Sequence, residues 1–125
     1  MITLLVQSPS DKIVLIKSER FNNQMVLPYI ESEINSDIQT LIRTHIEHML
    51  GITVSEVEFL KEGEFKNEQE TNKFYSYLVK ITEESIGNSD SGIKAILVDP
   101  HKAIKIVFEE PFTLNIIDYL KKIGD

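Results

Sequence analysis

Two short apolar segments near the N-terminus have the pattern of paired β-strands. Residues 2–7 and 12–17 are rich in Ile, Leu and Val, and a Ser-Pro-Ser-Asp sequence between them favours a turn. Residues 13–16 are apolar at every position, which is typical of a strand covered on both faces. A shorter apolar piece, 25–27, is ended by Pro28. The pattern therefore predicts two strands in a covered sheet and a short third strand.

Residues 36–50 have the spacing of an amphipathic helix. Apolar side chains recur every three or four positions and form one face: Ile38, Leu41, Ile42, Ile46, Met49 and Leu50. Ser36 followed by Gln39 resembles a capping box, and Gly51 is a typical C-terminal stop. We expect a helix over this whole segment.

The second half of the chain alternates between apolar and polar segments. Residues 54–60 and 74–81 predict two strands, and the acidic segment 62–72 between them is expected to be a long, solvated hairpin connection. A second polar loop over 83–92 precedes a strand at 93–98.

Two helices are expected at the C-terminus. Asp99 followed by Pro100 is a helix start, with Asp as the cap and Pro in the first turn, and Pro111 opens the last helix. The order of elements predicts an α+β fold, a mixed sheet packed between helices, rather than regular βαβ winding. No linker or repeat divides the sequence, so residues 1–125 are expected to form a single domain.

Composition narrows the function classes. The 20 acidic residues outnumber the 13 basic ones, giving a net charge of −7, which argues against a nucleic-acid partner. The absence of Cys excludes disulfides, thiolate metal sites and cysteine nucleophiles. No apolar window is long enough for a membrane span, and the N-terminus lacks a basic leader. These features predict a cytoplasmic protein with no membrane partner.

Residues 27–52 resemble the signature segment of Nudix hydrolases. The family pattern is Leu-Pro-Gly-Gly, a loop with Glu, a helix with Arg-Glu-apolar-any-Glu-Glu, and then any-Gly-apolar. This chain aligns to it without a gap and matches at Leu27, Pro28, Glu33, Ile46, Gly51 and Ile52. The flanking strands and C-terminal helices also follow the family order, so the resemblance spans nearly the whole chain. It implies a Nudix-like α/β/α sandwich.

The positions that carry the family's chemistry differ. In the family, three helix carboxylates bind magnesium or manganese, which polarise a pyrophosphate for attack by water. In this chain those positions hold His45, His48 and Met49, while Ser36 replaces a loop Glu and Thr44 the motif Arg. Magnesium and manganese prefer oxygen ligands. The resemblance therefore implies that ordinary metal-dependent pyrophosphohydrolase activity is lost and that no cofactor is needed.

The altered positions indicate a ligand-binding surface. Leu41, His45, His48 and Met49 fall on one arc of the expected helix, which suits packing or an apolar pocket. Tyr29 stands where the family places its first motif glycine, in the loop near its ligand. We therefore take these five residues as candidate ligand contacts, for a nucleotide or another small molecule. The plainer interpretation of both histidines is that they are partly buried edge residues.

Other functions remain open from the sequence. His45 and His48, three residues apart, can bind zinc, nickel or copper, with Glu31 or Glu33 completing the site. The same two glutamates are candidate general bases. In an atypical hydrolase of a nucleoside-diphosphate-linked substrate, Glu31, Glu33, His45 and His48 would together hold magnesium or manganese. A third alternative is a structural homodimer joined through the terminal helix or a strand edge.

Overall fold

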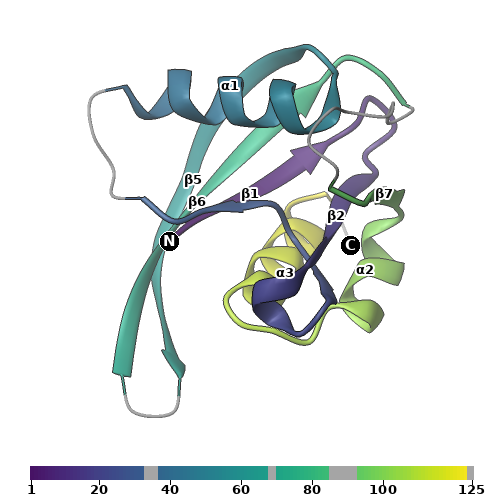
Figure 1. The fold of residues 1–125 in the computed structure, drawn as a ribbon. Helices are drawn as coiled ribbons and strands as arrows, with labels where there is room; N and C mark the ends of the chain where they lie inside the picture. The colour runs from purple at the N-terminus through teal and green to yellow at the C-terminus, as the bar shows by residue number, and fades with distance from the viewer. Residues whose placement is uncertain (33–36, 68–69, 85–92, 124–125) are drawn as a thin grey trace.

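The computed structural model describes residues 1–32, 37–67, 70–84 and 93–123 (Figure 1). Its elements are β1 (Ile2–Gln7), β2 (Ile13–Ser18), a 3₁₀ turn η1 (Glu19–Phe21), β3 (Gln24–Val26), β4 (Tyr29–Ile30), α1 (Ile38–Leu50), β5 (Val54–Asn67), β6 (Glu70–Ile81), β7 (Ala95–Val98), α2 (Pro100–Ile106) and α3 (Phe112–Lys122).

The strands form one mixed sheet between two helical layers. The main order is β3-β2-β1-β6-β5, with β4 also paired to β1 and β7 to β2. The pair β1–β6 is parallel, and the other pairs are antiparallel. Helix α1 lies on one side of the sheet, and α2 and α3 lie on the other (Figure 1). This arrangement confirms the expected α+β class with a mixed sheet packed between helices.

The centre of the sheet forms the core. Residues 13–16 of β2 are buried at every position, as their unbroken apolar run predicts, because helices or loops cover both faces. Helix α1 adds the buried face Ile38, Ile42, Ile46, Met49 and Leu50. The helix begins at Ile38 after Asp37 and ends at Gly51, whose φ of +68° is the left-handed conformation that glycine adopts without strain. Ser36, the expected cap, lies outside the described residues.

The expected loop over 62–72 is wrong. The β5–β6 ladder continues through this segment as far as the pair Asn67–Glu70, and makes a long antiparallel arm that projects from the body of the molecule (Figure 1). Phe65 packs on Phe74 with ring centroids 6.2 Å apart. Gly63 lies beside the same ring, where a side chain would overlap it. We expected a loop because the segment is acidic. The cross-strand contact between Phe65 and Phe74 stabilises the strand pairing.

The C-terminal helices follow the sequence pattern. Asp99 caps α2 by accepting a hydrogen bond from the backbone N–H of His101 at 2.8 Å. Helix α3 buries Phe112, Asn115 and Ile116 against the sheet. Among the described residues, no helix has the length and apolar character needed to span a membrane.

Candidate functional site

The candidate residues of α1 lie at different depths. Leu41 is 37% exposed, His45 is half-buried and His48 is exposed, so these three form a strip along one flank of the helix. Met49 is only 3% exposed and belongs to the hydrophobic core. The strip therefore consists of two imidazoles and one leucine, with Met49 packed beneath it.

The surroundings of His45 lower its pKa. Burial lowers the pKa of His45 below its usual value, and the nearby positive charge of His48 lowers it further. The neutral imidazole of His45 is thus favoured in the folded protein.

The opposite flank of α1 holds the first residue of β5. The carboxylate of Glu47 accepts a hydrogen bond from the backbone N–H of Val54 at 2.8 Å, and the guanidinium of Arg43 donates to the Val54 carbonyl. On the helix expected from the sequence, Glu47 points to the solvated side opposite the histidines, but in the structure it is half-buried and structural. This pair fixes the helix to the sheet on the side away from the histidines.

The donors on this surface do not fit magnesium or manganese. Within the described residues, no three His, Asp or Glu side chains gather in a way that would hold a metal ion. Glu31 forms an ion pair with Arg20 at the surface, and Glu33 lies outside the described residues. Imidazole is a poor ligand for hard divalent ions, so we derive no metal-dependent step here.

A hollow of about 500 Å³ lies beside Tyr29. The Tyr29 hydroxyl is hydrogen-bonded to Ser18 at 2.8 Å, which fixes the ring at the end of β2. Three cationic side chains, Lys17, Arg20 and Lys94, contribute to the lining. Of the five candidate ligand contacts from the sequence, Tyr29 is the one that lines this hollow.

Most of the aromatic side chains pack among themselves. Phe21, Tyr29 and Phe112 form a cluster with ring centroids 5.3 to 5.8 Å apart. Tyr77 is buried and meets Phe59 edge to face at 5.3 Å. In these contacts the aromatic rings serve as packing residues.

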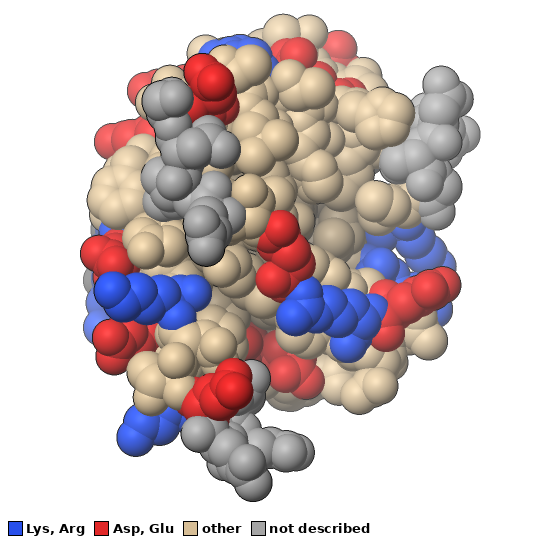
Figure 2. Space-filling model, turned by 60° about the vertical axis from the view of Figure 1, so that its left-hand side comes forward, with Lys and Arg blue, Asp and Glu red and all other residues tan. Residues whose placement is uncertain are grey.

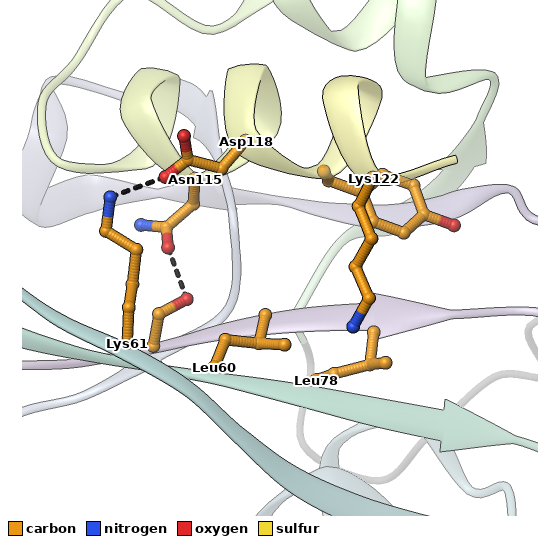
Figure 3. Close-up of a pocket in the computed structure, with 8 residues that line it drawn as sticks. Leu60, Lys61, Leu78, Asn115, Asp118 and Lys122 are labelled. Carbon is orange, nitrogen blue, oxygen red and sulfur yellow. Dashed lines mark hydrogen bonds and ion pairs between the residues drawn. The ribbon is translucent and has the colours of Figure 1, made fainter. Parts of the chain in front are cut away.

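A second pocket, of about 340 Å³, lies between α3 and the β5–β6 strands (Figure 3). Leu60 and Leu78 form its base on the sheet, while Asn115, Asp118 and Lys122 descend from the helix. Sequence analysis missed this pocket because its residues come from three distant segments. Asn115, a polar residue on the otherwise apolar face of the last helix, was the signal that could have revealed it.

On the face shown in Figure 2, acidic and basic residues are interspersed and do not gather in a patch of one sign. This face offers no continuous basic stripe of the kind that binds a phosphate backbone.

Comparison with known proteins identifies the architecture. No protein-family model matches the sequence, and no curated protein is significantly similar to it. Solved structures do match: the Nudix domain of Shewanella oneidensis NrtR complexed with ADP-ribose has a TM-score of 0.72 at 9% identity, covering 99% of this chain and 86% of that one. The chain has a Nudix-like fold.

Two further structures support this Nudix-like fold. A Caenorhabditis elegans Ap4A hydrolase, solved as a binary complex, has a TM-score of 0.69 at 11% identity and covers 98% of this chain and 97% of that one. A MutT structure, from work on the Aliivibrio salmonicida and Vibrio cholerae proteins, has a TM-score of 0.62 at 16% identity, with coverages of 94% and 93%. At these identities the likeness extends to the fold, over almost the full length of each chain.

Proposed function

We propose that this Nudix-like domain binds a nucleotide-linked small ligand and does not hydrolyse it by the metal-dependent route. The observation that carries the proposal is the flank of α1, where His45 and His48 occupy the positions that the family resemblance assigns to metal-binding carboxylates. A hard divalent ion finds no set of oxygen ligands there among the described residues.

The hollow beside Tyr29 is the proposed binding site of the ligand. Lys17 and Lys94 offer positive charge to an anionic ligand, while Arg20 in the same lining is paired with Glu31. A structural neighbour of this fold carries ADP-ribose. In our proposal Tyr29 contacts the ligand in the hollow. Leu41, His45 and His48 do not line the hollow and form a separate surface on α1, with Met49 beneath it.

Thermal shift with ADP-ribose tests the binding. We expect ADP-ribose to raise the melting temperature, because a ligand that binds only the folded state stabilises it by mass action. Replacing two cations of the hollow, Lys17→Gln with Lys94→Gln, should weaken this rise. The matched control, Lys102→Gln with Lys105→Gln on α2, makes the same change in charge outside the hollow and should retain the rise.

Product analysis separates binding from hydrolysis. The same samples are incubated with magnesium or manganese, and released phosphate or nucleoside monophosphate is measured. We expect no product. Product formation that is lost in His45→Ala and His48→Ala would instead establish the atypical hydrolase, with Glu31 or Glu33 as its base. A flat thermal shift across a panel of nucleotides would contradict the binding function.

A further inference from the structure

The pocket under α3 combines apolar walls with a polar inner end. Leu60 and Leu78 form the side nearer the sheet, and the buried ring of Tyr119 lies on the helix side. At the inner end, the Ser76 hydroxyl donates to the carboxamide oxygen of Asn115. A ligand that fills this space must therefore be mostly apolar, with a polar group at its buried end.

The inner polar groups retain hydrogen-bonding capacity. Asn115 is 3% exposed and uses one amide hydrogen on the Pro111 carbonyl at 3.0 Å, which leaves the second hydrogen for another acceptor. The Ser76 oxygen can also accept a bond. Buried polar groups of this kind favour a ligand that carries a hydroxyl.

The mouth of the pocket carries one uncompensated positive charge. Lys61 pairs with Asp118 at 2.5 Å, so these two charges offset each other. Lys122 extends from the end of α3 down toward Leu78, with its ammonium at the open side (Figure 3). Among the described residues, Lys122 has no carboxylate partner. A single negative charge on the ligand matches this arrangement.

We propose that the pocket binds a small aromatic monocarboxylate, with its ring between Leu60, Leu78 and Tyr119 and its carboxylate on Lys122. The volume of about 340 Å³ is at the lower end for ligand sites and suits one ring rather than a nucleotide. A hydroxyl opposite the carboxylate would meet Ser76 and Asn115. The site is separate from the hollow at Tyr29, so the inference goes beyond the proposed function and does not depend on it.

Amide chemical shifts provide the test. The whole chain, labelled with ¹⁵N, is titrated with benzoate, 4-hydroxybenzoate and uncharged benzyl alcohol. A ligand of about nine non-hydrogen atoms binds with a dissociation constant on the order of 1 mM. We expect saturable shifts at Ser76, Asn115 and Tyr119, with 4-hydroxybenzoate binding more tightly than benzoate and benzyl alcohol most weakly.

Two lysine variants give a matched comparison. Lys122→Gln should weaken benzoate binding about threefold to fivefold, the effect of losing one exposed ion pair. Lys121→Gln removes the same charge from the adjacent residue of α3, which does not line the pocket, and should bind as the unmodified protein does. Both lysines are exposed, so neither change disturbs the core.

Three results would overturn the inference. They are the absence of shifts at the pocket residues at about ten times the expected dissociation constant, equal weakening in the two lysine variants, and equal binding of benzyl alcohol and benzoate. Nucleotide binding is followed separately, through the amides of Lys17, Tyr29 and Lys94. Failure at one site therefore leaves the result at the other intact.

Discussion

Single residues decide how side chains pack between neighbouring strands of the sheet. Gly63 is the clearest case, because its missing side chain leaves room for the buried ring of Phe74 on the neighbouring strand. A β-carbon at this position overlaps the ring, and a fully buried phenylalanine has little freedom to move away.

Gly63→Ala is therefore expected to destabilise the protein by about 1–3 kcal/mol, the usual effect of overpacking. Urea unfolding measures the free energy. Glu64→Ala, at the adjacent exposed position, is the control and should stay within about 0.5 kcal/mol of the original protein. Equal stability of the two variants would show that the ring gives way at no cost.

His45 links stability to pH. Its pKa is lowered in the folded state by burial and by His48, so the unfolded chain takes up a proton first as the pH falls. Stability from this group is complete above the unfolded pKa of about 6.5, and it is lost as the pH decreases from that value through the lower pKa of the folded state.

His45→Gln should flatten this part of the stability curve. Urea midpoints at pH 7.5 and 5.5 measure the slope. Thr44→Gln, at the adjacent exposed and non-ionisable position of α1, is the control and should leave the slope unchanged. Retention of the full slope in His45→Gln would place its origin in other groups.

At the scale of elements, the β5–β6 arm is the main departure from the expected structure. Its outer part is rich in charged residues and lacks a long apolar run, so its stability comes from backbone pairing and from Phe65 on Phe74. A cross-strand contact of this kind is invisible until the strand register is known.

The arm should protect its own amides. Hydrogen exchange is expected to be slow at the ladder-bonded amides of 62–66 and 71–74, and Phe65→Ser should accelerate it there with little effect on α1. Fast exchange of the amides over 62–72 in the original protein would contradict the ladder and support the solvated loop expected from the composition.

For the whole molecule, the sequence predicted the local elements well and the contacts between them poorly. The apolar run of β2, the stop at Gly51 and the cap at Asp99 are local signals, and each is confirmed. The pocket under α3 depends on Leu60, Ser76 and Asn115 meeting across the fold, which no local spacing encodes. Glu47 was similarly assigned to solvent because its partner, the backbone of Val54, is not a sequence signal.

The charge on the edge strand β5 is expected to oppose association of the molecule with a second copy. Strand β5 lies at the end of the main strand order and carries exposed glutamates: Glu56, Glu58, Glu62 and Glu64. Like charges on an edge strand oppose pairing with a second copy. Replacing all four by Gln should promote self-association at neutral pH, measured as an increase of mass in light scattering.

The control for this experiment replaces four glutamates away from β5, namely Glu19, Glu83, Glu109 and Glu110, by Gln. It makes the same change in net charge and should preserve the original mass. Association to the same extent in both variants would assign the effect to overall charge. A stable dimer of the unmodified chain would support the structural homodimer.

Two hydrogen bonds from α1 to Val54 hold the helix in place without involving the residues on its other flank. Arg43 and Glu47 fix the rotation of the helix from one flank, and its buried residues fix its depth against the sheet. Leu41, His45 and His48, on the other flank, therefore contribute little to the position of the helix. Substitutions at these three positions can change the chemistry that the helix presents at small cost in stability. This division allows one scaffold to exchange one chemistry for another during evolution and still fold.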